Sequence, residues 1–186
     1  MLLVVLHGYG QLAEYFIRKF KEVPENYLVI APEGMHRFYL NGTSGRVGAS
    51  WMTKEGRESD IADNQNWLTQ LYSELTEQKT FEKKILLGFS QGGATAVRWF
   101  YSQKVQFDHL ILWASVFPPD LEKPIIQSNY KNYFVIGTDD EFYNSEEQKS
   151  EIKFYQNIGF QTLQFKGKHD IQADTLNNII KDEEEI

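Results

Sequence analysis

Six short apolar runs, separated by segments of helical periodicity, constrain the fold more than any other feature of this sequence. Two of them, Ile85-Leu86-Leu87 and Leu110-Ile111-Leu112, are continuously apolar, as expected for strands that are buried on both faces of a sheet. Strands that alternate with helices favour a parallel sheet covered by helices on both sides, so we predict an α/β fold. The predicted strands are Leu2–Leu6, Tyr27–Ala31, Lys84–Gly88, Leu110–Ala114, Tyr133–Gly137 and Thr162–Phe165.

The intervals between these runs predict helices. Between Leu68 and Leu75, apolar residues fall at i, i+3, i+4 and i+7 and form one face that should pack on the sheet. A later helix is expected to begin at Ser145, because Ser145-Glu146-Glu147-Gln148 fits a capping box, and to end before Gly159. The last helix is expected over residues 170–181.

Length and composition exclude several classes of protein. The 186 residues predict one domain over 1–186, with residues 182–186 as an acidic tail, and 41% hydrophobic residues supply a sizeable core. The net charge of −7 argues against nucleic acid as a partner. The absence of cysteine excludes disulfide bonds, thiol nucleophiles and thiolate metal sites.

The N-terminal apolar run bears on the location of the protein. Leu2–Leu6 is too short for a signal-peptide core or a transmembrane segment, so we expect a cytoplasmic protein.

One long stretch of the sequence is predicted to be irregular. The residues from Pro32 to about Glu58 are rich in glycine and are expected to form one long loop with a functional role, as a lid or a packed loop. Asn41-Gly42-Thr43 within it is interpreted as a turn.

The strongest chemical signal is Gly88-Phe89-Ser90-Gln91-Gly92-Gly93, which lies between a predicted strand and a predicted helix. This is the G-x-S-x-G pattern in the strand–turn–helix context that it requires, so Ser90 is the candidate nucleophile. The alternative is a tight turn with a spectator serine. A phosphate-binding loop fits poorly, because Ala94 stands where such a loop has its lysine.

A serine nucleophile needs a base and a group that orients the base. Of the four histidines, only His169 follows a late strand, and it is the candidate base. The preceding strand is followed by Asp139, Asp140 and Glu141, three acids that compete for the orienting role. The chain order Ser, Asp, His is that of an α/β-hydrolase triad.

The negative charge of a tetrahedral intermediate requires backbone N–H donors. The loop His7-Gly8-Tyr9-Gly10 after the first strand can supply one donor, and the N–H of Gln91 can supply another at the positive end of a helix. His7 itself is interpreted as a structural residue that supports this loop.

Several segments together form a recognisable pattern: His7-Gly8-Tyr9-Gly10, Ala31-Pro32-Glu33-Gly34, Ala49-Ser50-Trp51, Gly88 to Gly93, Gly137 to Asp140, and Gly167-Lys168-His169. With them the chain resembles the phospholipase/carboxylesterase branch of the α/β-hydrolase superfamily, which includes the acyl-protein thioesterases. The resemblance implies an α/β-hydrolase fold with a reduced sheet of six strands in the order 2-1-3-4-5-6. It also places the oxyanion donors on the N–H groups of Tyr9 and Gln91. It selects Asp140 over Asp139, although the Glu141 that follows departs from the family pattern.

Aromatic residues cluster in loops expected on the catalytic side and would form an apolar acyl slot: Tyr9, Trp51, Phe117, Phe142 and Tyr143. The resemblance places a pocket wall at Phe117. Nothing polar in the sequence singles out a charged head group. We therefore expect an uncharged or weakly polar acyl ester or thioester of short to medium chain length as the substrate.

The prediction from sequence is a serine hydrolase with the triad Ser90, Asp140 and His169, working through an acyl-enzyme without a metal or organic cofactor. The alternatives are a non-catalytic ligand-binding module on the same fold, and an acyltransferase or peptidase using the same triad. By analogy with the family, whose apolar patches sometimes mediate dimers, a homodimer is also considered.

Overall fold

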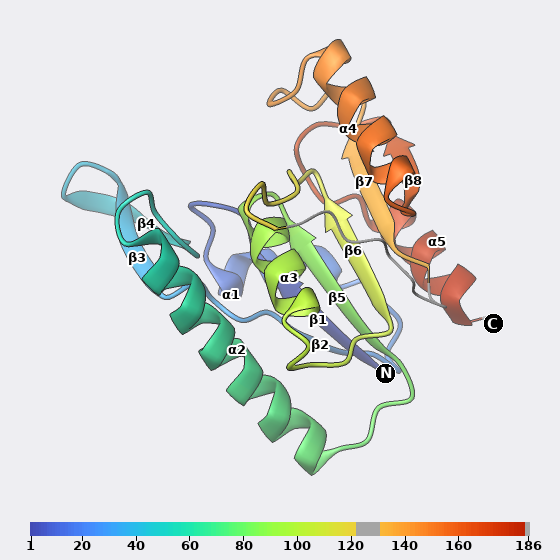
Figure 1. The fold of residues 1–186 in the computed structure, drawn as a ribbon, viewed down its shortest axis with the longest axis horizontal. Coiled ribbons are helices and arrows are strands. Elements are labelled where there is room, and N and C mark those ends of the chain that lie inside the picture. The colour runs from blue at the N-terminus through green and yellow to red at the C-terminus, as the bar shows by residue number, and fades with distance from the viewer. Residues whose placement is uncertain (122–130, 185–186) are drawn as a thin grey trace.

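A computed structural model describes residues 1–121 and 131–184, and within them a six-stranded sheet has the strand order β2-β1-β5-β6-β7-β8 (Figure 1). Every neighbouring pair of these strands is parallel. The predicted fold class and strand order are confirmed. The strands are β1 (Leu2–Leu6), β2 (Leu28–Ile30), β5 (Lys84–Phe89), β6 (His109–Trp113), β7 (Tyr133–Gly137) and β8 (Gln161–Phe165).

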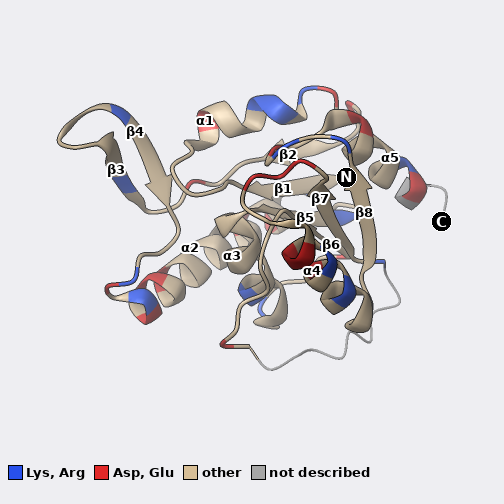
Figure 2. Cartoon of the chain, turned by 90° about the horizontal axis from the view of Figure 1, so that it is seen from above, with Lys and Arg blue, Asp and Glu red and all other residues tan. Residues whose placement is uncertain are grey.

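Helices cover both faces of this sheet, as the view from above in Figure 2 shows. Alternate side chains of β1 point to opposite faces, so Leu2, Val4 and Leu6 lie in one apolar cluster and Leu3 and Val5 in another. The first cluster includes residues of α2 (Arg57–Gln78), α3 (Gln91–Tyr101) and α4 (Ser145–Asn157). The second includes residues of α1 (Ala13–Phe16), the 3₁₀ helix η1 (Ile17–Phe20) and α5 (Ala173–Glu184).

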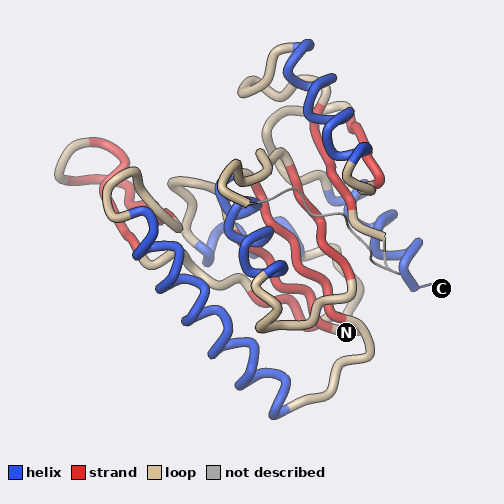
Figure 3. The backbone as a smooth tube through the Cα atoms, viewed as in Figure 1, coloured by secondary structure: helices blue, strands red, loops and turns tan. Residues whose placement is uncertain are grey.

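The stretch predicted as one irregular loop, residues 32–58, instead holds a β-hairpin. Its strands β3 (His36–Asn41) and β4 (Ser44–Ser50) pair antiparallel and lie beyond the main sheet, beside the start of α2 (Figure 3). The turn at Asn41-Gly42 has Gly42 at φ 61°, and Asn-Gly is the strongest short-range hairpin signal in a sequence. The turn was predicted, but the strands on either side of it were not.

Helix boundaries differ from the predictions by a few residues. Helix α4 begins at Ser145 as predicted, but the capping box uses Asn144 as N-cap and Glu147 as its partner, one residue earlier than expected. Helix α5 continues to Glu184, so the first acids of the presumed tail belong to a helix, while residues 185 and 186 lie outside the described residues. Among the described helices, none is both long and apolar enough to cross a membrane.

Candidate active site

The carboxyl ends of parallel strands lie at one edge of a sheet, and the chemistry predicted from sequence gathers there. The loop after β1 carries His7 and Tyr9, the turn after β5 carries Ser90, and the loops after β7 and β8 carry Asp140 and His169. Strand β1 stands between β2 and β5 in the sheet, so the chain winds in opposite directions from it. Such a switch point is where open α/β sheets form ligand crevices.

Ser90 occupies a strained backbone conformation between β5 and α3. Its φ of 51° and ψ of −120° lie outside the regions that non-glycine residues favour. Its N–H donates to the carbonyl of Trp113 at 2.9 Å, and its own carbonyl accepts from Gly93 at 3.0 Å, so the turn is fixed at both ends. This is the geometry by which a strand-to-helix turn exposes a nucleophile.

Two glycines make this turn sterically feasible. A Cβ at Gly88 would lie 2.5 Å from the Cα of Gly93, and one at Gly92 would lie 2.5 Å from the carbonyl oxygen of His7. Both obstacles are backbone atoms and cannot rotate away. The glycines of the motif therefore bring β1, the turn and α3 into close contact.

His169 and Asp140 form a close pair. The Nδ1 atom of His169 lies 2.7 Å from Oδ2 of Asp140, whose side chain is fully buried, while 12% of the His169 side chain is exposed. The second oxygen, Oδ1, accepts from the N–H of Phe142 at 3.0 Å. The rings of Phe89 and Phe142 lie 4.9 and 4.5 Å from the imidazole. Because Phe89 directly precedes Ser90, the imidazole lies at the end of β5 that carries the serine.

The two neighbouring acids do not contact the imidazole. The side chain of Asp139 is exposed. Glu141 is also exposed, and its Oε2 accepts from the backbone N–H of His169 at 3.3 Å. Hydrogen bonds from its own N–H and from that of His169 lower the pKa of Glu141. Of the three acids, the structure therefore brings only Asp140 to the ring of His169.

Two backbone donors at this edge have no acceptor among the described residues: the N–H groups of Tyr9 and Gln91. The loop around Tyr9 is held on both sides, because the N–H of Gly8 donates to Oε1 of Gln11 at 3.0 Å and that of Gly10 donates to the carbonyl of Ala49 at 2.9 Å. Gln91 begins α3, where the first N–H groups of a helix are free and the helix dipole is positive.

His7 lies buried beneath this loop. Its Nε2 accepts from the N–H of Gly34 at 2.9 Å, so the proton must reside on Nδ1, which lies 2.8 Å from the carbonyl oxygen of Gly8. Burial lowers the pKa of His7, because the charged form would lose its hydration. A neutral imidazole with both nitrogens engaged is a structural link between the segments that contain Gly8 and Gly34.

The side chain of Gln91 makes contacts that the sequence did not suggest. Its Oε1 accepts from the N–H of Trp51 at 3.1 Å and its Nε2 donates to the carbonyl of Met52 at 2.9 Å. Oε1 also lies 3.2 Å from the hydroxyl of Ser50. These bonds join the residue after the candidate nucleophile to the end of the hairpin. The only signal in the sequence is that Ala49-Ser50-Trp51 and Gln91 both belong to the recognised pattern.

The aromatic residues expected to line the pocket fall into two groups. Tyr9 and Phe142 are 60% and 71% exposed at the site. The side chain of Trp51 is fully buried in this structure, and its Nε1 donates to the carbonyl of His7 at 2.8 Å, so it does not present its ring at the surface of the site. Phe117 is also in the core.

Phe117 is 7% exposed, and its ring packs against Phe154 and Tyr155 of α4. Tyr143 is half-buried and packs against the same apolar cluster. Burial raises the pKa of its hydroxyl. In this structure both residues therefore support the fold beneath the site, because their loops turn the side chains inward.

Comparison with known proteins bears on the family and the fold of this chain. The profile of the Phospholipase/Carboxylesterase family matches residues 1–182. A carboxylesterase from Bacillus cereus is 15% identical, with a TM-score of 0.70 over 99% of this chain and 87% of that chain. Acyl-protein thioesterase 2 from Zea mays is 17% identical, with a TM-score of 0.71 over 97% and 90%. At these identities the likeness shows a shared α/β-hydrolase fold.

A curated relative differs in length from this chain. It is named "Probable 1-acylglycerol-3-phosphate O-acyltransferase", comes from Oryza sativa subsp. japonica, and is 28% identical over 110 residues. The match covers 59% of this chain and 24% of the relative, so it spans about a quarter of that protein.

Proposed function

Since the chain belongs to the phospholipase/carboxylesterase family, we propose that it is a serine hydrolase that cleaves carboxylic esters or thioesters of short to medium acyl chains. Ser90 is the nucleophile, His169 the general base and acid, and Asp140 the group that orients the imidazole. The observation that carries the proposal is the 2.7 Å contact between His169 and the buried carboxylate of Asp140, at the strand end where Ser90 lies in a strained turn.

The first half of the reaction transfers the acyl group to the enzyme. Nε2 of His169 takes the proton of Ser90, and Oγ attacks the carbonyl carbon. The N–H groups of Tyr9 and Gln91 stabilise the negative charge on the former carbonyl oxygen. When the intermediate collapses, the C–O or C–S bond breaks and the leaving oxygen or sulfur takes the proton from His169.

The second half returns the enzyme to its starting state. Water loses a proton to His169 and attacks the acyl-enzyme, and the serine oxygen leaves with that proton as the carboxylic acid is released. Each step moves one proton between groups of this chain and the substrate, and none requires a metal or an organic cofactor. The exposed ring of Phe142, which packs against His169, offers an apolar surface to the substrate.

A second candidate function is acyl transfer to an alcohol. The observation that favours it is the similarity to the rice protein named as a probable acyltransferase. The same acyl-enzyme would then react with an alcohol instead of water. Adding glycerol as an acceptor and measuring the ratio of ester product to free acid separates the two candidates.

The test of the nucleophile is labelling with a fluorophosphonate, followed by intact mass and peptide mapping. We expect stoichiometric modification of Ser90 in the folded protein and none in heat-unfolded protein. Ser90→Ala should abolish labelling and ester hydrolysis, while Ser73→Ala, at an exposed serine of α2, should change neither. A folded protein that takes no label would instead indicate a non-catalytic binding module.

A further inference from the structure

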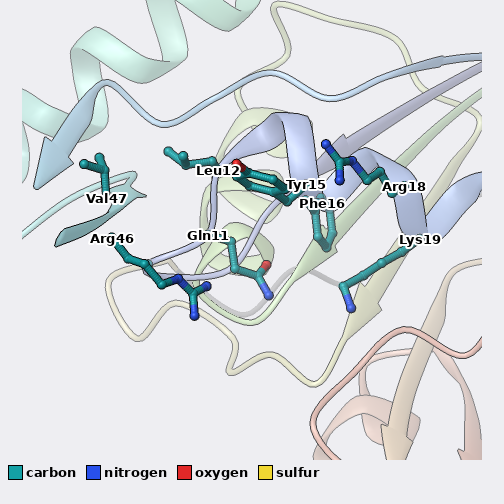
Figure 4. A pocket seen from close by; sticks show the side chains of 9 residues that line it. Gln11, Leu12, Tyr15, Phe16, Arg18, Lys19, Arg46 and Val47 are labelled. Carbon is teal, nitrogen blue, oxygen red and sulfur yellow. The ribbon is translucent and has the colours of Figure 1, made fainter. Parts of the chain in front are cut away.

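A hollow of about 860 Å³ opens beside the loop that carries Tyr9 (Figure 4). Gly10 and Gln11 form one wall, the segment of α1 and η1 a second, and β4 a third. The hollow therefore begins one residue from the N–H of Tyr9. Its lining is unusual for a protein of net charge −7, because it holds three basic side chains and no acidic one: Arg18, Lys19 and Arg46.

The pairing of β4 with the loop sets the position of Arg46. The N–H of Gly10 donates to the carbonyl of Ala49, and the N–H of Ala49 donates to the carbonyl of Gln11 at 3.2 Å. A Cβ on Gly48 would meet the backbone of Gly10, so Gly48 faces the loop. Arg46 lies two residues before Gly48 on β4 and lines the hollow, as Figure 4 shows.

Donors in the hollow are available for a ligand. Oε1 of Gln11 accepts from Gly8, which leaves its Nε2 with no acceptor among the described residues, and Arg46 likewise has no acidic partner among them. Figure 4 shows the polar ends of Gln11, Lys19 and Arg46 directed to the same side of the loop. Arg18 is less available, because its guanidinium lies over the ring of Tyr15 at 4.7 Å.

Lys19 connects the hollow to the candidate base. Its Nζ pairs with Oδ1 of Asp170 at 2.5 Å, and Asp170 directly follows His169. The leaving group must lie against His169 to receive its proton. The ion pair therefore places one end of the hollow next to the loop that carries His169.

We infer that this hollow binds a phosphate or carboxylate group carried by the alcohol or thiol portion of the substrate, an inference that rests on the proposed function. Arg46 supplies the charge, and Nε2 of Gln11 supplies a neutral donor. Lys19 contributes less, because its ammonium already pairs with Asp170. The inference revises the expectation of an uncharged substrate. The hollow could not be predicted from sequence, because residues 11, 19 and 46 belong to three separate segments and form no motif.

The test compares aryl esters that carry an anion on the leaving phenol, an anion on the acyl chain, or no anion. Phenyl butanoate is the neutral reference. The compounds 4-(butanoyloxy)phenyl phosphate and 4-(butanoyloxy)benzoate carry phosphate or carboxylate on the leaving phenol. Monophenyl glutarate carries a carboxylate on the acyl side and is compared with phenyl pentanoate. We expect kcat/KM for at least one leaving-group anion to exceed that of the neutral ester by about tenfold, and high salt to reduce the preference.

Variants identify the groups responsible. Arg46→Gln should lower the ratio of kcat/KM for the anionic ester to that for the neutral ester by about tenfold, and Arg46→Lys should retain part of it. The matched control is Arg37→Gln on β3, which removes the same charge from the same hairpin but from a guanidinium paired with Glu33 at 2.6 Å. This control should leave the ratio unchanged.

A binding measurement separates failure of this inference from failure of the proposed function. Phenyl phosphate and benzoate are titrated calorimetrically into the wild type. At least one should bind, and Arg46→Gln should weaken that binding by about tenfold. This readout does not depend on hydrolysis. Equal kcat/KM for all esters, a preference for monophenyl glutarate, or no binding of either anion would each overturn the inference, and each would leave the proposed hydrolase function in place.

Discussion

Both oxygens of the buried Asp140 carboxylate are engaged, Oδ2 by Nδ1 of His169 at 2.7 Å and Oδ1 by the N–H of Phe142 at 3.0 Å. A carboxylate held at two points cannot rotate, so it fixes the plane of the imidazole. It also favours the tautomer with its proton on Nδ1, which leaves Nε2 free to accept a proton. The orientation of the His169 imidazole is therefore set by the loop after β7.

Asp140→Asn is expected to lower kcat by about 10³- to 10⁴-fold, because an amide donor opposite Nδ1 would favour the wrong tautomer. Steady-state hydrolysis of phenyl butanoate measures the effect. Asp139→Asn is the matched control: it makes the same change one residue away, at an exposed side chain, and should retain activity. If the two variants exchanged behaviour, the acid would be Asp139.

The sheet could be predicted from sequence because its strands are buried on both faces. All three side chains of Leu110-Ile111-Leu112 are buried, so every position of the strand is apolar and the strand is visible in the sequence as a continuous apolar run. The β3–β4 hairpin has the opposite character. Most of its side chains are exposed or half-buried, and Gly45 and Gly48 interrupt any alternation. Backbone hydrogen bonds between Ala49 and the loop at Gly10 help to hold the hairpin in position. Such bonds do not depend on side chains, so they produce no hydrophobic pattern in the sequence.

The part of the candidate site that neighbouring residues in the sequence determine could be predicted. The turn around Ser90 is specified by glycines within two residues of it, and their close contacts explain why. The direction of a side chain that follows a strand is not local. Trp51 and Phe142 both lie in loops at the catalytic edge, yet Trp51 turns inward to the carbonyl of His7 and Phe142 turns outward over His169.

Phe142→Ala should reduce kcat/KM for hexanoate esters by about tenfold and have a smaller effect on acetate esters, because the ring offers apolar surface beside the reacting centre. Since the side chain is 71% exposed and the N–H bond to Asp140 is retained, the melting temperature should not change. Trp67→Ala, at another partly exposed aromatic residue on α2, controls for loss of a ring elsewhere. An equal loss for all chain lengths would assign Phe142 to positioning of His169 instead.

Gln91→Ala should lower the free energy of unfolding by about 1–3 kcal/mol, because the N–H of Trp51 and the carbonyl of Met52 lose their partner in a part-buried environment. Urea denaturation measures the change. Gln70→Ala is the control, since Gln70 is exposed on α2 and its side chain bonds only to Glu74 among the residues that the structure describes. A Gln91 variant as stable as wild type would show that the hairpin end is held by other contacts.

His7 makes stability depend on pH, with a sign that follows from its lowered pKa. Burial lowers the pKa of His7 below its ordinary value of 6.5, so as pH falls below about 6.5 the unfolded chain takes up a proton that the folded protein does not. Stability should therefore fall with acidification from about pH 6.5 down to the folded pKa, by at most about 1.4 kcal/mol per pH unit.

Urea denaturation of the wild type and His7→Gln between pH 8 and pH 5 measures this contribution. The variant should be less stable at pH 8, because it disturbs the bonds to Gly34 and Gly8, and its stability should depend less steeply on pH. Nitrogen-15 spectra of the wild type at pH 8 should show neutral His7 with its proton on Nδ1, and the pKa of His7 from a pH titration of these spectra should lie below 6.5. An unchanged slope in the variant would mean that another group binds the proton, and His7 would then stabilise the loop without coupling its stability to pH.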